Sequence, residues 1–274
     1  MELHTVNRVR RPASVEEIES WEAGYAWLAG GTWLFSEPQP DVHTLVDLES
    51  FRWPSLRASD DGLEIGSTCK VAELDEFADK AQSDWTAAPL FRLCCRSFLS
   101  SFKIWNEATV GGNICMSLPA GPMISLTAAL EGTCTLWPRG GDPRRVPVVD
   151  FVTGDHQNVL APGELLRSIV LPAHALRKRF AFRRFTLTHL GRSEVLIIGT
   201  RCSEHGEFLL TITAATVRPV QLHFDVLPAA QVLGRAIDDA VPPGLYLDDV
   251  HGSPAHRKHL THYFAEQIRA ELSA

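Results

Sequence analysis

Glu107-Ala108-Thr109-Val110-Gly111-Gly112-Asn113-Ile114 holds a pair of glycines between two short polar side chains. Glycine lets a backbone approach a ligand closely or adopt positive φ angles, and the flanking side chains can hydrogen-bond. A diglycine alone is more typical of a turn. The chain carries a second one, Ala29-Gly30-Gly31-Thr32, directly after the apolar segment Tyr25-Ala26-Trp27-Leu28. Bare backbone amides at a strand end favour anions, so we interpret both as ligand loops, with a tight turn as the alternative at Ala29.

The composition is that of an ordinary globular protein and excludes several classes of function. The 274 residues carry a formal net charge of −7, with 45% hydrophobic and 22% charged residues. An acidic chain is a poor general partner for nucleic acid. No apolar run is long enough to span a bilayer, and the N-terminus lacks a basic region followed by an apolar one. We therefore expect a cytoplasmic protein.

The cysteine and histidine patterns predict no metal centre on this chain. None of the six cysteines forms a Cys-x-x-Cys pair, which argues against an iron–sulfur cluster or a zinc site. His256, His259 and His262 lie three apart, whereas zinc helices usually space histidines by four, so we favour a solvated helix face. The sequence also lacks a Gly-x-Ser-x-Gly elbow and a His-Glu-x-x-His motif, which leaves hydrolase functions without support. The cysteines are Cys69, Cys94, Cys95, Cys115, Cys134 and Cys202.

Local patterns predict mixed helices and strands, with a change of pattern near residues 172–178. Ser14 and Glu17 form the signature of a helix that begins with a capping box and ends at Gly24. Ser67 or Thr68 is the expected cap of a helix over 71–80. Further helices are expected over 87–99, 122–131, 228–233 and 254–272. Strands are expected over 25–28, 44–48, 63–66, 133–137, 165–171, 180–187, 195–202 and 208–217, the last two as a hairpin.

With both glycine loops placed, the chain resembles the FAD-binding (medium) subunit of the molybdenum hydroxylases, the relatives of xanthine dehydrogenase, carbon monoxide dehydrogenase and aldehyde oxidase. The resemblance covers almost the whole length. Its strongest parts are the two loops, about eighty residues apart, and Pro119-Ala120-Gly121. Supporting matches are Gly66-Ser67-Thr68, Gly163-Glu164-Leu165-Leu166, Arg218-Pro219-Val220 and Asp248-Asp249-Val250-His251-Gly252-Ser253-Pro254-Ala255-His256-Arg257.

The resemblance implies an α+β fold with FAD extended between two subdomains of the vanillyl-alcohol oxidase type, followed by a C-terminal α+β domain of the CO dehydrogenase flavoprotein type. The expected boundaries are 1–55 and 56–174 for the two FAD-binding subdomains and 175–274 for the C-terminal domain. Backbone amides and the Thr32 hydroxyl would cradle the diphosphate. The implied cofactor-binding residues are Leu28, Ala29, Gly30, Gly31, Thr32, Trp33, Leu34, Thr109, Gly111, Gly112, Asn113, Leu166 and Arg184.

Leu166 is expected to pack near the isoalloxazine, and Arg184 falls where many relatives have a lysine near the flavin. A solvated strand edge or a subunit contact is the alternative for Arg184 and its basic neighbours at 177–183.

The chain departs from the family pattern at four positions. Trp33 stands where many relatives have aspartate, and Trp105 replaces the arginine of an Ile-Arg-Asn sequence. Pro122 replaces an aspartate that bonds to the ribityl chain in many relatives, and His256 replaces the tyrosine of a Tyr-Arg pair. One lost charge-assisted bond costs about 1.5–3 kcal/mol, which is roughly a ten- to hundredfold loss of affinity.

The expected function is that of an oxidoreductase subunit that transfers electrons and has no catalytic acid or base of its own. By resemblance, electrons pass from molybdopterin on a large subunit through two-iron two-sulfur clusters on a small subunit to FAD here, and then to NAD⁺, oxygen or another acceptor. A dimer of heterotrimers is the expected assembly. Two alternatives remain: a degenerate member without productive FAD that serves as a structural or docking subunit, and a stand-alone flavin oxidase.

Overall fold

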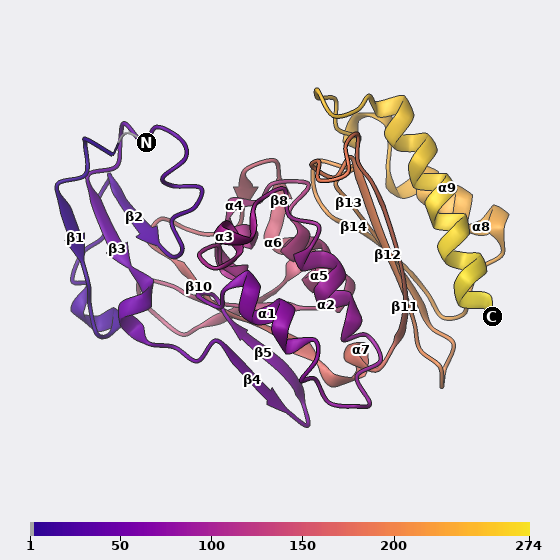
Figure 1. The fold of residues 1–274 in the computed structure, drawn as a ribbon, viewed down its shortest axis with the longest axis horizontal. Coiled ribbons are helices and arrows are strands. Elements are labelled where there is room, and N and C mark those ends of the chain that lie inside the picture. Colours follow the sequence, from indigo (N-terminus) through magenta and orange to yellow (C-terminus); the bar gives the residue numbers. More distant parts are fainter. Residues whose placement is uncertain (1–2) are drawn as a thin grey trace.

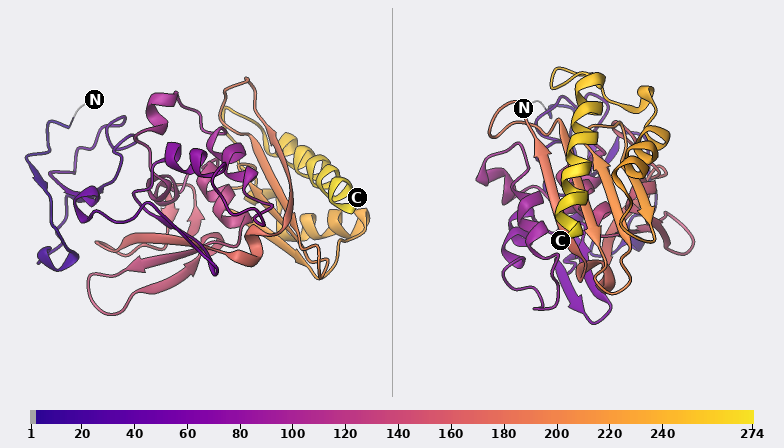
Figure 2. Two further views of the ribbon diagram at one scale, coloured as in Figure 1. Left: turned by 60° about the horizontal axis from the view of Figure 1, so that its bottom comes forward. Right: turned by 90° about the vertical axis from the view of Figure 1, so that its right-hand side faces the viewer.

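Three sheets follow one another along the longest axis of the molecule. The computed structural model describes residues 3–274, with the side chain of Phe102 left out of the description. Figure 1 shows a small N-terminal sheet, a central sheet covered by short helices, and a C-terminal sheet covered by two longer helices. The left view of Figure 2 also separates these layers, and the right view looks onto the C-terminal end, with α9 in front of its sheet. These sheets fall in the ranges 8–47, 56–172 and 179–224.

The N-terminal sheet is parallel, with strand order β1-β3-β2. Its predicted strands at 25–28 and 44–48 are confirmed. The three-residue edge strand β1 was not predicted from the sequence. The segments are β1 (Arg8–Arg10), β2 (Tyr25–Leu28), β3 (Thr44–Asp47) and the 3-10 turns η1 (Val15–Glu17) and η2 (Leu48–Phe51).

The helix predicted from Ser14 to Gly24 is wrong, since only the single turn η1 forms. Ser14 makes no capping hydrogen bond, and the Glu17 carboxylate accepts from Ala13 N at 2.9 Å instead. The carbonyls that would continue the helix have distant partners, because Arg10 donates to Glu17 O and Arg139 donates to Ile18 O. Tertiary contacts therefore overrule the local capping signal.

The central sheet is antiparallel throughout, with order β4-β5-β10-β6-β7. All residues of α5 are buried because this helix lies between the other central helices and the C-terminal sheet, where Ser125 Oγ and Thr213 Oγ1 are 2.7 Å apart. The strands are β4 (Leu56–Ser59), β5 (Gly62–Gly66), β6 (Thr133–Trp137), β7 (Arg144–Pro147), β8 (Val152–Gly154), β9 (Gln157–Asn158) and β10 (Leu165–Pro172). The helices are α1 (Val71–Phe77), α2 (Pro89–Cys95), α3 (Phe102–Trp105), α4 (Val110–Met116), α5 (Pro122–Ala129), α6 (Val148–Phe151) and α7 (Ala173–Leu176).

Two local predictions in this region need correction. The N-cap of α1 is Lys70, whose N–H donates to Glu73, and not Ser67 or Thr68. The Gly111-Gly112 pair is not a loop, because both glycines lie in the first turn of α4, which Thr109 caps. The helix forms there because its first amides find acceptors outside the helix or in the cap itself.

The C-terminal sheet is an antiparallel meander, β11-β12-β13-β14, which includes the predicted hairpin. Helices α8 and α9 cover its outer face (Figure 1). Arg257 on α9 is fully buried and donates to Ala214 O at 2.7 Å, which ties the helix to the end of the sheet. The elements are β11 (Arg179–Phe185), β12 (Val195–Arg201), β13 (Phe208–Thr213), β14 (Val220–Phe224), α8 (Ala230–Ala240), η3 (Pro243–Leu245) and α9 (Pro254–Ser273).

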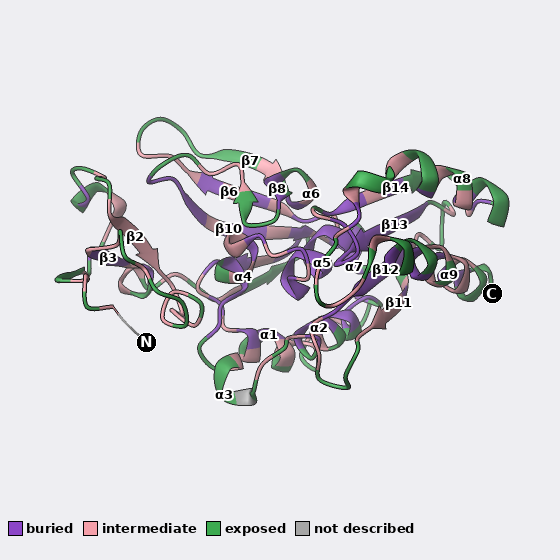
Figure 3. Cartoon of the chain, turned by 90° about the horizontal axis from the view of Figure 1, so that it is seen from above, coloured by how far each residue is buried: buried purple, intermediate pink, exposed green. Residues whose placement is uncertain are grey.

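Burial is distributed unevenly over the three layers. Two hydrophobic cores lie on the two faces of the C-terminal sheet, one shared with the central layer and one beneath α8 and α9. Neither core includes a described residue before Leu56. Figure 3 shows the same contrast, with little buried chain in the N-terminal layer. That layer therefore depends on specific contacts with its neighbours for its position.

Candidate functional site

The first glycine loop, Ala29–Leu34, leaves a row of backbone donors unpaired. From Gly30 to Leu34, no backbone N–H has an acceptor among residues 3–274. The turn that follows is closed by Phe35 N to Gly31 O at 2.8 Å and Ser36 N to Trp33 O at 2.9 Å, so these donors stand at the open end of a helix-like turn. The Thr32 hydroxyl likewise has no described partner. Such a row of amides is suited to an anion.

Glycine is required in this loop by space and by backbone angle. A Cβ on Gly30 would lie 1.7 Å from Glu107 O, so the loop packs directly on the chain just before α4. Gly31 has φ +68°, a left-handed angle that glycine adopts readily. The two glycine regions predicted from the sequence therefore touch, through backbone atoms.

The second glycine segment, Thr109–Asn113, has its amides fully used from Val110 onwards. Val110 N donates to Cys69 O at 2.9 Å, and Gly111 N donates to Ser67 O at 3.0 Å. Gly112 N donates to Thr109 Oγ1 at 3.0 Å, and Asn113 N to Thr109 O at 3.0 Å. This segment can therefore offer a ligand its surface and side chains, but not these amides.

The two glycines of the second segment do different work. Gly111 is buried, and a Cβ there would come within 2.5–2.6 Å of Ser67, including its backbone. Gly112 is exposed, and its only close neighbour would be Thr109 Oγ1 at 2.8 Å. Gly111 thus serves packing, while Gly112 leaves the surface of α4 bare.

Asn113 links the second segment to α5. Its Oδ1 accepts from Met123 N at 3.1 Å, at the first turn of α5. Its Nδ2 has no acceptor in the described part of the chain, and the side chain is half-buried. The Nδ2 group of Asn113 is therefore available as a hydrogen-bond donor, while its Oδ1 is occupied by Met123 N.

A short hairpin, β8–β9, approaches the first glycine loop from beyond the far end of α4. His156 N donates to Ser117 O at 3.0 Å, and Asn158 Nδ2 donates to Cys115 O at 2.8 Å, which fixes the hairpin to the end of this helix. The Trp33 and His156 rings lie 5.7 Å apart. The first glycine loop thus contacts the chain near both ends of α4. No sequence pattern had predicted this hairpin.

One hydrogen bond and one ion pair tie the N-terminal layer to charged residues of the central layer, through Trp27 to Glu164 and through Glu49 to Lys70. Glu164 is buried, and its carboxylate accepts two hydrogen bonds of 2.7 Å from Arg144, while its backbone carbonyl accepts from Trp27 Nε1 at 3.1 Å. Arg144 holds the pKa of Glu164 below its usual value. Lys70 Nζ pairs with Glu49 and lies 3.8 Å from Glu107 Oε2. Glu164 appeared in the sequence only as part of a supporting motif.

Leu166 and Arg184 lie on β10 and β11, and β10 packs against α4, the helix of the second glycine segment. Leu166 is buried in the core, beside a bulge at Arg167, whose carbonyl accepts from Ser67 N at 3.1 Å. Arg184 lies on β11, where its Nε donates to Ser193 Oγ at 2.7 Å and its Nη2 to Gly191 O at 2.6 Å. Burial lowers the pKa of its guanidinium.

The four departures from the family pattern have defined surroundings. Pro122 is buried at the first turn of α5 and offers no donor. Trp105 Nε1 is buried without an acceptor in the described chain. His256 Nδ1 lies 2.7 Å from Glu194 Oε1, a structural partner in the C-terminal layer, and Trp33 is 40% exposed. Only Trp33 lies at the amide row.

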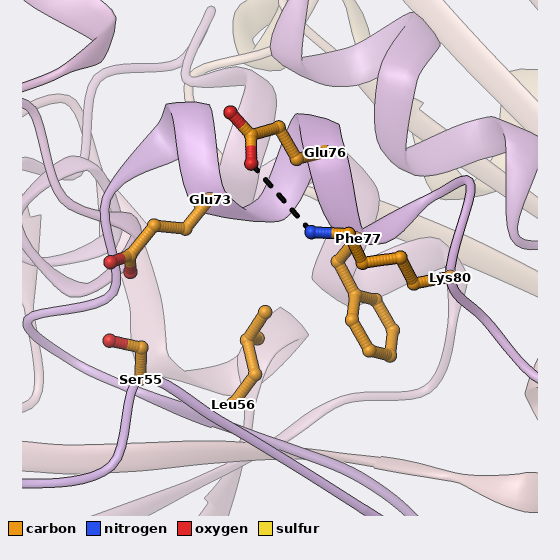
Figure 4. Close-up of a pocket in the computed structure, with 6 residues that line it drawn as sticks. All are labelled: Ser55, Leu56, Glu73, Glu76, Phe77 and Lys80. Carbon is orange, nitrogen blue, oxygen red and sulfur yellow. Dashed lines mark ion pairs between the residues drawn. The ribbon is translucent and has the colours of Figure 1, made fainter.

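The surface hollows lie elsewhere. One of about 340 Å³ is lined by Ser55, Leu56, Glu73, Glu76, Phe77 and Lys80, with Glu76 and Lys80 paired at 3.8 Å (Figure 4). It contains no residue of either glycine region and has no row of donors. It is a charged hollow beside α1 and not the candidate site.

The cysteines are free thiols and do not cluster with other metal-ligand side chains in the described part of the chain. All six are free, and burial raises the pKa of Cys115 to about 12. Within the described residues, no three histidine, cysteine, aspartate or glutamate side chains come together in a way that could hold a metal ion. No helix over 3–274 is long and apolar enough to cross a membrane.

The whole fold matches that of solved structures. The chain is similar to quinoline 2-oxidoreductase from Pseudomonas putida 86, with TM-score 0.74, 19% identity and 96% and 95% of the two chains covered. It is also similar to a carbon monoxide dehydrogenase from Hydrogenophaga pseudoflava, with TM-score 0.77, 17% identity and the same coverage. The predicted fold class is confirmed by these matches.

Residues 5–174 match the family described as the FAD-binding domain in molybdopterin dehydrogenase. The chain belongs to this family and is the FAD-binding component of an oxidoreductase. Xanthine dehydrogenase from Oryza sativa subsp. japonica is 30% identical over 139 residues, which cover 48% of this chain and 9% of that protein. A xanthine dehydrogenase from Arabidopsis thaliana is 29% identical over 124 residues, again 9% of its length.

The residues present at the two glycine regions fit FAD. A diphosphate needs several N–H donors at short range, and the unpaired row from Gly30 to Leu34 supplies them without side-chain obstruction. The Thr32 hydroxyl and Asn113 Nδ2 are additional donors. The bare surface at Gly112 allows close approach.

Proposed function

We propose that the first glycine loop and the second glycine segment bind the diphosphate of FAD between them, and that the chain transfers electrons within a heteromeric molybdenum hydroxylase. The observation that carries the proposal is the row of five unpaired N–H groups from Gly30 to Leu34, packed against the chain that enters α4. Bound FAD would supply the redox chemistry, since a flavin accepts and releases electrons.

Each residue would act by position. The amides from Gly30 to Leu34 and the Thr32 hydroxyl donate to phosphate oxygens, with Leu28 and Ala29 leading the chain into the row. Asn113 Nδ2 donates alongside Gly112, while Gly111 and Thr109 hold α4 in place. We further propose that Leu166 packs near the isoalloxazine and that Arg184 stabilises the reduced ring. Residues 1–55, 56–174 and 175–274 would form the two FAD-binding subdomains and the C-terminal domain.

The rest of the electron path would lie on partners. The alignments span only 9% of the xanthine dehydrogenases that match. We propose a small subunit with two-iron two-sulfur clusters and a large subunit with molybdopterin, assembled as a dimer of heterotrimers. NAD⁺, oxygen or another acceptor would receive the electrons.

The test is a cofactor titration of the purified full chain, followed by its visible spectrum and by calorimetry. FAD should bind with a flavin spectrum, and riboflavin, which lacks phosphate, should bind at least about a hundredfold more weakly, since several hydrogen bonds to charged groups are lost. Equal affinities would contradict the diphosphate assignment.

A docking subunit without FAD is a second candidate, because Pro122 and Trp105 remove a ribityl contact and an arginine expected from the family pattern. A chain that stays colourless with excess FAD would support it and refute the leading proposal. A stand-alone oxidase would instead consume oxygen without partners, and co-purification of molybdenum and iron–sulfur subunits would count against it.

A further inference from the structure

The first glycine loop is attached differently at its two ends. At Gly30, backbone packs on backbone, with a space too small for any side chain. At Trp33, the attachment is an exposed side chain, whose indole lies 5.7 Å from the His156 ring at an interplanar angle of 50°. The distance is within the range of attractive aromatic pairs.

The partner of Trp33 is held firmly. His156 sits in the tight turn of the β8–β9 hairpin with φ +56°. Its backbone N–H donates to Ser117 O, its Nδ1 lies 2.8 Å from Asp155 Oδ1, and Asn158 anchors the hairpin to the end of α4. The backbone at His156 is therefore held in place, and its imidazole offers a surface against which the Trp33 indole can close or from which it can swing away.

We propose that Trp33 and His156 form an aromatic clasp that closes the Trp33 end of the amide row over bound FAD and slows its release. The inference rests on the proposed binding of FAD at this row. A ligand held between the loop and α4 must enter and leave where the contact can open. The Gly30 end would have to break backbone packing, whereas a rotation of the exposed Trp33 side chain opens the other end. Exposed side chains change rotamer within nanoseconds.

The clasp makes a kinetic prediction. Losing either ring should raise the dissociation rate of FAD about three- to tenfold, the range that an aromatic pair contributes, without lowering the association rate. The test variants are Trp33→Ala and His156→Asn, because asparagine tolerates the left-handed angle of this turn. Trp33→Phe keeps an aromatic ring and should lose less than Trp33→Ala.

The experiment uses the full chain loaded with FAD and follows flavin fluorescence after dilution. Tyr263→Ala is the matched control, because Tyr263 is an exposed ring that faces His259 on α9, away from the amide row. Thermal unfolding of each FAD-free variant checks that the fold is kept. The double variant Trp33→Ala/His156→Asn should release FAD no more than about twofold faster than the faster single variant, since the two rings act as one contact.

An unchanged release rate in His156→Asn would overturn the clasp, even if Trp33→Ala releases FAD faster, because Trp33 would then contact the cofactor alone. Fully additive effects in the double variant would overturn it as well. If the unaltered chain fails to bind FAD, the proposed function itself is refuted. Release rates that change in both variants but not in Tyr263→Ala support the clasp.

Discussion

The two glycine regions share a sequence pattern and differ in what their backbones do. In the first glycine loop, five successive N–H groups are left without acceptors among the described residues. In the second glycine segment, every N–H from Val110 to Asn113 is used within the fold. In the proposed site, the first region therefore supplies donors for a ligand, and the second is a support that brings α4 against those donors.

The difference shows that a glycine pair can mark a binding backbone or a packing backbone. Gly30 and Gly111 are both places where another chain segment comes too close for a Cβ, at Glu107 and Ser67 respectively. Gly112 alone faces outward. In the proposed site, the ligand-facing part of the second segment is thus Gly112 together with the side chain of Asn113.

The largest expected effect separates the two glycines of the second segment. Gly111→Ala should lower the free energy of unfolding by about 3 kcal/mol, because its Cβ overlaps the Ser67 backbone and one chain must move. Gly112→Ala, the matched control, should change it by less than about 1 kcal/mol but weaken FAD binding. Urea unfolding of the FAD-free chain measures the first effect, and FAD titration the second. Equal stabilities would break the assignment of a packing role to Gly111.

A smaller effect tests Asn113 as a donor. Asn113→Asp keeps the oxygen that caps α5 but replaces Nδ2 with a negatively charged atom, so stability should be retained while FAD affinity falls about ten- to a hundredfold. Asn113→Ala should lose about 1 kcal/mol of stability with the cap. Calorimetric titration with FAD, paired with thermal unfolding, distinguishes the two. An aspartate variant that binds FAD normally would remove Asn113 from the site.

The smallest effect concerns the ion pair of Glu164 and Arg144. Glu164→Gln should cost about 1 kcal/mol at neutral pH, since Arg144 is partly exposed. Because the pKa of Glu164 is lowered in the folded chain, its contribution is present above the unfolded pKa of about 4.3 and is lost as the pH falls through the lower folded value. The difference in unfolding free energy between the two proteins should therefore shrink below about pH 4. A constant difference down to pH 2 would contradict the ion pair.

Much of the fold could be predicted because it rests on local patterns. The apolar runs at 133–137 and 165–171 became β6 and β10, and Pro122 begins α5 as expected. The failures have a common cause in contacts from distant residues. Arg139 takes the Ile18 carbonyl that a helix would need, and Cys69 and Ser67 accept the amides that let α4 begin at the diglycine.

The contact between the two glycine regions could be expected from the sequence, but their different roles in the fold could not. The pairing of the two glycine regions followed from the family resemblance, and their contact through Gly30 and Glu107 agrees with it. Gly111 faces Ser67 because of how α4 packs against the chain after β5. No local sequence pattern encodes that packing. No sequence pattern predicted the β8–β9 hairpin or the position of His156. Both are placed by hydrogen bonds to the end of α4, between residues far apart in the sequence.

The absence of the described N-terminal residues from both hydrophobic cores affects how this layer is stabilised. Residues 3–55 belong to neither hydrophobic core, and their contacts with the central layer include polar anchors, the Trp53–Trp137 ring pair and the backbone contact at Gly30. A ligand that binds only the folded form adds its binding free energy to folding. FAD would therefore stabilise this layer as a buried core stabilises the other two. The protection of the first fifty-odd residues from proteases should then rise and fall with the fraction of chains that hold FAD.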